Sequence, residues 1–346
     1  MSGRGRILLS TGPTPLDGRG AKGGSLSAIT TSPISSVGPA IQPTQLPLPG
    51  RGRSRLIRRQ EGWGLKFVTP FVVIFLLFTV LPLCYAIYTS LYTNKLVGGK
   101  SFSGFANYSA IFANGAFWSG VVRVLIFAAI QIPVMLGLAF FFAVIFDLGL
   151  PRFGAFFRTV FFIPFAVPAV VGSVMWCFLL LPQFGPFTRL ADTLGFTHTN
   201  FFSANLILPT IIVIVIWEWT GYNMIILYTA LKMIPDDIVE AALIDGAPLR
   251  KIVFRIKLPM VRRAIVMLVF LNVIGSLQLF TEPQILGNFE PQAISFGFTP
   301  AIFIYNTAIG DLQDYQAAAA AVVLGLVVVV ISVASLVLRV RKKGLA

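Results

Sequence analysis

The sequence predicts an α-helical integral membrane protein with six transmembrane helices. Of the 346 residues, 56% are hydrophobic and only 12% are charged, and the mean hydropathy is +0.84. A soluble globular protein cannot bury so much apolar surface. The apolar residues gather into six stretches, each long enough for a helix to cross a bilayer. Lys and Arg fall mainly in alternate connections between these stretches, as membrane topology requires.

The first sixty residues differ in composition from the rest. Gly, Ser and Pro supply 25 of residues 1–60, nine more are Lys or Arg, and Asp17 is the one acidic residue. Such a composition does not support a packed core. We therefore expect a disordered cytoplasmic tail over 1–60, with its arginine cluster near anionic lipid headgroups, and a membrane domain over 61–346. An Arg- and Ser-rich leader also fits an organellar transit peptide, whereas a secretory signal would need an apolar segment that is absent here.

Prolines inside the apolar stretches predict bent helices. We expect kinks at Pro133, Pro164 and Pro168 rather than breaks, because neighbouring helices can satisfy the freed carbonyl groups. The run Ala317–Ala321 gives the last stretch a small-residue face suited to close helix packing. The expected spans lie near 67–92, 121–146, 156–181, 205–231, 264–286 and 316–338.

The distribution of positive charge predicts the orientation. With the N-terminus inside, the cytoplasmic side holds 23 Lys and Arg residues and the outer side holds 4. Without the residues before the first span, the ratio is still 13 to 4. The positive-inside rule therefore places both termini in the cytoplasm. In a membrane protein the net charge of +14 reports topology, so no nucleic-acid partner is expected.

The connection 232–261 carries the most specific pattern in the chain. Glu240-Ala241-Ala242 is followed after three residues by Gly246. Asp237 can cap a helix, with Glu240 three residues on as in a capping box. Gly246 permits the positive φ of a sharp turn.

A second short helix is expected after that turn. Pro248 suits its first turn, and Ile252, Val253 and Ile256 give it an apolar stripe. Leu258 and Pro259 follow, and we expect Pro259 to end this helix before the fifth span. The predicted product is a helix–turn–helix exposed to the cytoplasm.

This spacing resembles the "EAA" loop in the permease subunits of ABC importers. In that family a cytoplasmic ATPase binds this loop. An ordinary amphipathic loop on the membrane surface is the alternative interpretation, and an E-A-A triplet alone would favour it. The full pattern, on the cytoplasmic side of a six-span protein, favours the docking role. The residues that the resemblance assigns to ATPase coupling are Asp237, Glu240, Ala241, Ala242, Gly246, Ile256, Leu258 and Pro259.

The chain from about residue 63 onward is similar to sugar-type permeases, the maltose and glycerol-phosphate permease group. Supporting stretches are Phe105–Tyr108, Arg158–Pro164, Trp217–Asn223, Ile234–Asp237 and Ile274–Phe280. This resemblance implies a six-span bundle paired with a second permease subunit, a cytoplasmic ATPase dimer and an extracytoplasmic solute-binding protein, in the plasma (inner) membrane.

The chain itself is not expected to be an enzyme. Its nearest approach to a phosphate-binding loop is Gly99-Lys100-Ser101, but Asn94 stands where the first glycine is needed. ATP and Mg²⁺ would therefore bind the separate ATPase. Cys84 and Cys177 lie in apolar stretches, and His198 is the single histidine, so neither a metal site nor catalytic residues are expected.

The resemblance also implies a sugar path near mid-membrane. In the fourth span it assigns Trp219, Thr220, Gly221 and Asn223. In the fifth span it assigns Asn272, Ser276 and Leu279, which share one helix face. Helix–helix packing is the alternative for each. Glu218 is an intramembrane carboxylate beside this path, and such groups are candidates for function. We expect Glu282, at the outer end of the fifth span, to be solvated.

The preferred function is import of a neutral sugar or oligosaccharide. A permease for a phosphorylated or other charged solute is the alternative, but an anion calls for cationic partners. Spans two to six contain only Arg123 and Arg158, both near helix ends. A more distant alternative is an integral-membrane transferase, which would need clustered acids or histidines.

Overall fold

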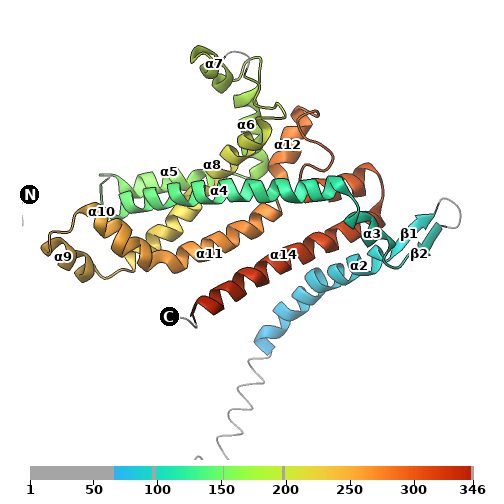
Figure 1. Ribbon diagram of the computed structural model, residues 1–346, viewed down its shortest axis with the longest axis horizontal. Helices are drawn as coiled ribbons and strands as arrows, with labels where there is room; N and C mark the ends of the chain where they lie inside the picture. The colour runs from blue at the N-terminus through green and yellow to red at the C-terminus, as the bar shows by residue number, and fades with distance from the viewer. Residues whose placement is uncertain (1–65, 96–98, 151, 197–198, 344–346) are drawn as a thin grey trace, which may run out of the picture. The chain divides into compact units, whose positions relative to one another are not determined.

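The computed structural model describes residues 66–95, 99–150, 152–196 and 199–343 (Figure 1). The chain divides into two units, Met1–Lys66 and Phe67–Ala346. The predicted tail, 1–60, lies outside the described residues. The second unit is predominantly helical, and its description follows.

The first half begins with a long helix and a small hairpin. The helix Lys66–Ser90 contains the π-helical turn η1 (Leu76–Val80) and α2 (Leu81–Ser90). Strands β1 (Tyr92–Lys95) and β2 (Gly99–Phe102) pair antiparallel, with Tyr92 opposite Phe102. The helices that follow are α3 (Ala106–Phe112), α4 (Gly115–Asp147), α5 (Gly154–Ala166), α6 (Ala169–Leu180) and α7 (Pro186–Thr193).

The second half contains the most buried helix and the predicted loop. Helix α8 (Ile207–Lys232) leads into α9 (Asp236–Ile244), and the chain returns through α10 (Leu249–Lys251) and the π-helical η2 (Ile252–Lys257). The remaining elements are α11 (Leu258–Leu277), α12 (Thr281–Phe289), α13 (Pro300–Tyr305), η3 (Asn306–Gly310) and α14 (Asp314–Lys343).

Among the described residues, five helices are long and apolar enough to cross a membrane, and the total is six if one bent pair forms a single span. That pair is α5 and α6, whose axes differ by 95°. The expected kink at Pro168 is therefore wrong: the helix breaks there. Proline disfavours helical geometry for the preceding residue, and Val167 is extended with ψ 129°. Pro133 and Pro164 stay inside α4 and α5 as expected.

The fifth apolar stretch is also interrupted. We expected one helix over 264–286, but α11 ends at Leu277 and α12 begins at Thr281. Residue Phe280 between them has φ −138° and ψ −53°. This interruption lets α12 pack against α6 and α8 (Figure 1).

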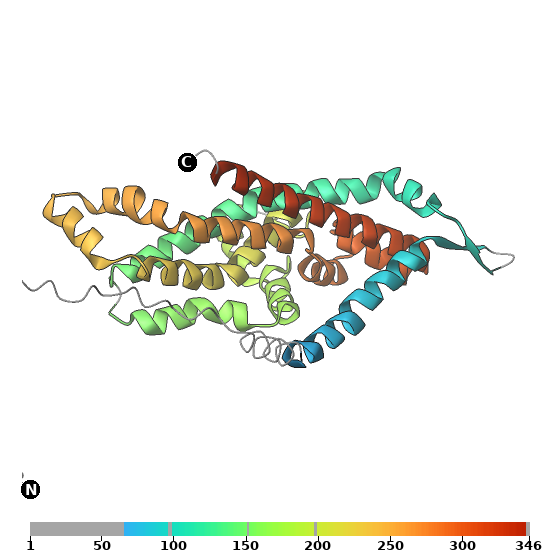
Figure 2. The same cartoon turned by 90° about the horizontal axis from the view of Figure 1, so that it is seen from below.

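Helix α8 lies at the centre of the bundle. It packs against α4, α5 and α11 (Figure 2). Within its most apolar stretch of 18 residues, 61% of the residues are buried. In the corresponding stretch of the helix Lys66–Ser90, 0% of the residues are buried, so that helix presents its apolar surface outward. At Gly221, α8 approaches α5 so closely that an added Cβ would overlap the carbonyl oxygen of Phe161.

Gly221→Ala should therefore destabilise the fold. The added methyl must push α5 and α8 apart, and overpacking of this kind costs about 1–3 kcal/mol. Thermal unfolding in detergent would measure the loss. Gly325→Ala in α14 is the matched control, because no atom lies within 4 Å of the site of its Cβ. Equal melting temperatures for the two variants would contradict the close contact between α5 and α8.

Candidate functional site

The loop between α8 and α11 forms the predicted helix, glycine turn and second helix. Gly246 has φ +73°, and its N–H donates to the Leu243 carbonyl oxygen at 3.0 Å. The Ala247 N–H donates to the Ala242 carbonyl oxygen at 2.9 Å. These bonds satisfy carbonyl groups at the end of α9. They require a left-handed backbone conformation at the turn, which glycine adopts without strain.

Two local expectations about this loop are wrong. Asp237 does not cap α9: the helix begins one residue earlier, Pro235 holds the N-cap position, and no side chain bonds there. Asp236 and Asp237 lie in the first turn, where their negative charge interacts favourably with the helix dipole. Pro259 does not end the second helix either. It lies in the first turn of α11, and the π-helical η2 joins α10 to α11 because the Leu258 N–H bonds to the Val253 carbonyl.

The loop presents an apolar surface to solvent. Helix α9 contains no buried residue, and Ile244 is 86% exposed. Contiguous exposed apolar side chains, bordered by charged residues, mark interaction sites. We call this set the loop patch; its members are Ile238, Leu243, Ile244, Leu249 and Phe254, with Arg250, Lys251 and Arg255 beside them. Of the residues assigned to coupling, Asp237, Glu240, Ala241, Gly246 and Pro259 are exposed, and Ala242, Ile256 and Leu258 are half-buried.

A buried ion pair anchors the return half of the loop. Lys257, in η2, pairs with Asp147 at the end of α4, and their side chains are 8% and 5% exposed. Lys232, at the end of α8, pairs with the same carboxylate at 3.0 Å and is half exposed. A single carboxylate therefore joins the return half of the loop to the ends of α4 and α8.

A polar cavity of about 470 Å³ opens among α4, α6, α8, α11 and α12. This volume lies within the range of about 300–1,000 Å³ typical of small-molecule sites. Its hydrogen-bonding side chains come from four of those helices and the link after α11, and within the described residues no Lys or Arg lines it. The polar and aromatic lining residues are Gln131, Glu218, Trp219, Tyr222, Asn272, Ser276, Gln278, Phe280, Thr281 and Glu282.

Five of the eight residues assigned to a substrate path line this cavity: Glu218, Trp219, Asn272, Ser276 and Leu279. The other three face elsewhere. Thr220 turns its hydroxyl back to the Ile216 carbonyl of its own helix. Gly221 lies at the close contact between α8 and α5.

Asn223 takes part in helix packing. It is fully buried, donates to the Trp219 carbonyl at 2.9 Å and accepts a bond from Asn272 Nδ2 at 3.0 Å. That bond joins α8 to α11 inside the bundle, as amide side chains often do in membranes.

The sequence analysis did not assign six of the polar and aromatic lining residues to the substrate path: Gln131, Tyr222, Gln278, Phe280, Thr281 and Glu282. Glu282, expected to be solvated, is only 7% exposed, and its carboxyl interacts with that of Glu218. Gln131 and Tyr222 also line the cavity. The signal for Gln131 was present, because a lone amide in the apolar α4 needs a polar neighbour. Glu282 could not be placed from sequence, since its burial depends on how α12 folds back.

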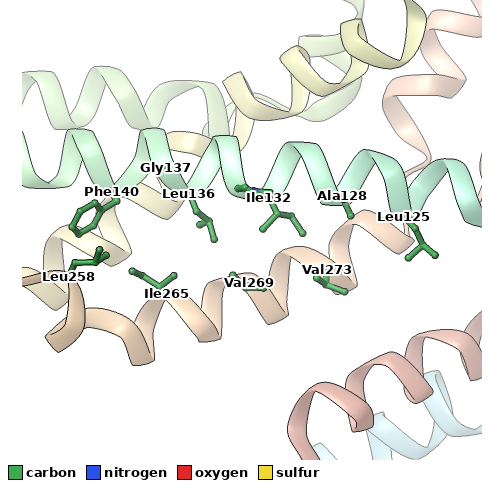
Figure 3. A pocket seen from close by; sticks show the side chains of 12 residues that line it. Leu125, Ala128, Ile132, Leu136, Gly137, Phe140, Leu258, Ile265, Val269 and Val273 are labelled. Atoms are coloured by element: carbon green, nitrogen blue, oxygen red, sulfur yellow. The ribbon is translucent and has the colours of Figure 1, made fainter. Parts of the chain in front are cut away.

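A second cavity, of about 630 Å³, is an apolar groove between α4 and α11 (Figure 3). Leu125, Ile132, Phe140, Leu258 and Val269 are among its lining side chains, and every lining residue is apolar. Such a groove offers a polyhydroxyl solute no hydrogen bonds, so the smaller polar cavity is the better candidate for one.

A helical membrane bundle that encloses a polar cavity with ionisable side chains has the features of an α-helical transport protein. Residues 135–343 match the family model for the inner membrane component of binding-protein-dependent transport systems. A lactose transport system permease protein of Rhizobium radiobacter is 30% identical over 81% of this chain and 95% of its own length. The chain belongs to this family of binding-protein-dependent inner membrane transport components.

Other relatives carry related descriptions. The trehalose/maltose transport system permease protein of Thermococcus litoralis is 28% identical over 80% of this chain and 92% of its own length. Among solved structures, a bacterial ABC transporter involved in the import of the acidic polysaccharide alginate gives a TM-score of 0.73 at 18% identity, over 84% of this chain and 99% of that one. This structural similarity establishes the fold: a helical permease bundle.

Asp147→Asn should destabilise the protein and loosen the loop. The change leaves Lys257 charged and buried beside a neutral partner, and breaking a buried pair in this way costs about 3–5 kcal/mol. Thermal unfolding and the rate of trypsin cleavage within 232–261 would measure both effects. Lys232→Ala is the control, because an exposed partner contributes up to about 1 kcal/mol. Similar small losses in both variants would rule out an anchoring role for Asp147.

Proposed function

We propose that this chain is the permease subunit of an ATP-driven importer for a neutral sugar or oligosaccharide. The observation that carries the proposal is the polar cavity: amide, hydroxyl and carboxyl groups lie beside Trp219 and Tyr222, with no cation among the described lining residues. Such groups bind sugar hydroxyls, and an aromatic ring stacks against the C–H face of a sugar. The names of the lactose and trehalose/maltose relatives agree with this substrate class.

The phosphorylated or charged solute is the less favoured alternative. An sn-glycerol-3-phosphate permease protein of Rhizobium meliloti is 30% identical over 52% of this chain. A phosphate, however, calls for Arg or Lys, and the described lining of the cavity contains two carboxyl groups instead.

The partners follow from the loop and the family. The loop patch would dock a cytoplasmic ATPase dimer, which would bind ATP and Mg²⁺. A second permease subunit would complete a pseudo-two-fold heterodimer, and an extracytoplasmic solute-binding protein would deliver the sugar. The charge asymmetry supports cytoplasmic termini and a cytoplasmic loop patch.

The test is purification of the complex after co-expression with the genes that neighbour this one. Its ATPase activity would be measured with its binding protein against lactose, trehalose, maltose, arabino-oligosaccharides and glycerol 3-phosphate. Recovery of an ATPase and a second permease, with stimulation by a neutral sugar, is the expected result. Stimulation by glycerol 3-phosphate alone would overturn the substrate class, and a solitary chain without a bound ATPase would overturn the docking role.

Gly246→Pro should uncouple ATP hydrolysis from transport. Proline cannot adopt φ +73° and lacks the N–H that donates to Leu243, so α9 would lose its position. We expect sugar uptake to fall by roughly tenfold or more, equivalent to about 1.4 kcal/mol, while membrane insertion persists. Gly246→Asn is the control, since asparagine tolerates the left-handed region. Normal uptake in the proline variant would refute the coupling role.

A further inference from the structure

The buried polar groups of the cavity have an unbalanced hydrogen-bonding pattern. Gln131 is 2% exposed, and its Oε1 atom has no partner. Its Nε2 atom is already engaged with the sulfur of Met135 at 3.1 Å. The amide therefore presents a free acceptor where unsatisfied polar atoms are costly.

The two carboxyl groups extend this pattern. Glu218 from α8 and Glu282 from α12 are each 7% exposed. Their side chains interact with each other, and neither forms an ion pair with any described residue. Two buried carboxyl groups in contact share a proton, and their remaining oxygen atoms accept hydrogen bonds and do not donate them. With no cation beside them, these acceptors need a ligand that supplies donors.

Two neighbouring donors, Asn272 and Ser276, are occupied within the protein. Asn272 Nδ2 donates to the Asn223 side chain at 3.0 Å and to the Leu268 carbonyl at 2.8 Å. The Ser276 hydroxyl donates to the Asn272 carbonyl at 2.8 Å. The buried polar part of the lining, namely Gln131, Glu218, Ser276 and Glu282, therefore offers mainly acceptors, whereas Gln278 and Thr281, which also line the cavity, are less buried. Trp219 and Tyr222, which are less buried, flank it with aromatic surface.

We propose that Gln131, Glu218 and Glu282 form an acceptor subsite that binds hydrogen-bond-donating groups of the transported solute and rejects a carboxylate or phosphate there. The shared chemistry is a donor, which either the hydroxyl groups of a neutral sugar or the ammonium group of an amino sugar can supply. An anionic group would face two carboxyl groups and an unpaired amide oxygen, and like charges in a low-dielectric site repel strongly. This inference rests on the proposed transport function and specifies which substrates it admits.

The test uses the complete purified complex in proteoliposomes, with its binding protein, and the neutral sugar that stimulates the wild type in the panel above. Glu218→Gln and Glu282→Gln keep shape but replace an acceptor oxygen by a donor, and Gln131→Leu removes the free acceptor. Each should raise the half-saturating sugar concentration about tenfold or more, as expected for the loss of a hydrogen bond to a buried polar or charged group. Glu290→Gln, the same change at the end of α12 and away from the cavity, should have no effect.

Thermal stability separates a binding role from a structural one. Glutamine keeps a hydrogen-bond donor toward the remaining carboxyl group and removes one buried ionisable group, so the ligand-free Glu218→Gln and Glu282→Gln complexes should melt at the same temperature as the wild type or higher. A lower melting temperature would indicate that a cation of the partner permease pairs with these groups, and would overturn the subsite. Unchanged sugar dependence in all three variants would overturn it as well.

Substrate analogues distinguish the two sources of donors. The neutral sugar would be compared with its 6-phosphate and its 2-amino-2-deoxy form. Preference for the amino form, lost in Glu218→Gln, would identify an ammonium group as the ligand, and equal or better use of the neutral form would identify hydroxyl groups. Transport of the phosphate with equal efficiency would contradict the rejection of anions. Absence of stimulation by any neutral sugar in the wild type would instead contradict the proposed function itself.

Discussion

Within a membrane, a buried polar group has no bulk water to satisfy it, and this constraint governs the interior of the protein. Two neighbouring amides obey it: Asn272 of α11 donates across to Asn223 of α8, and Asn223 donates to a carbonyl group of its own helix. Because these bonds fix α8 against α11, they set the position of the cavity between the two helices. The free oxygen of Gln131 and the two carboxyl groups meet in the cavity that these amide bonds border.

The same constraint explains the contact between the loop and the bundle. Lys257 is buried in the segment η2, and it is tolerated because Asp147 neutralises it. The pair joins α4 to the start of α11, and both helices line the polar cavity. In the proposed transporter, this short covalent and ionic connection would carry a displacement of the loop to the cavity-lining helices.

Close packing of the central helices adds geometric precision. Gly221 allows α5 and α8 to touch at the backbone of Phe161. The ring of Phe165 in α5 stacks on Tyr222, with 4.6 Å between the ring centroids, and its centroid lies 5.2 Å from that of Trp219. The aromatic side of the cavity is thus held by α5. The break at Pro168 then directs α6 away from α5, so that Ala169 at its start also reaches the cavity.

The sequence alone determined the class of fold, the positions of the long helices and the turn at Gly246. These features depend on local properties, namely the hydropathy of about 20 consecutive residues and the conformational freedom of one glycine. The spacing of Glu240, Gly246 and Pro259 in the loop 232–261 also indicated the family to which the chain belongs. Several cavity residues, such as Trp219 and Asn272, were found in the same way.

Only the tertiary structure decided which polar residues meet. Glu218 and Glu282 are 64 positions apart, and their contact requires α11 to stop at Leu277 so that α12 can pack beside α8. The 95° bend at Pro168 and the continuation of the helix through Pro259 depend likewise on neighbouring segments. A proline lacks an N–H donor wherever it lies, but the surrounding packing determines whether the helix bends, breaks or shifts to π-helical geometry.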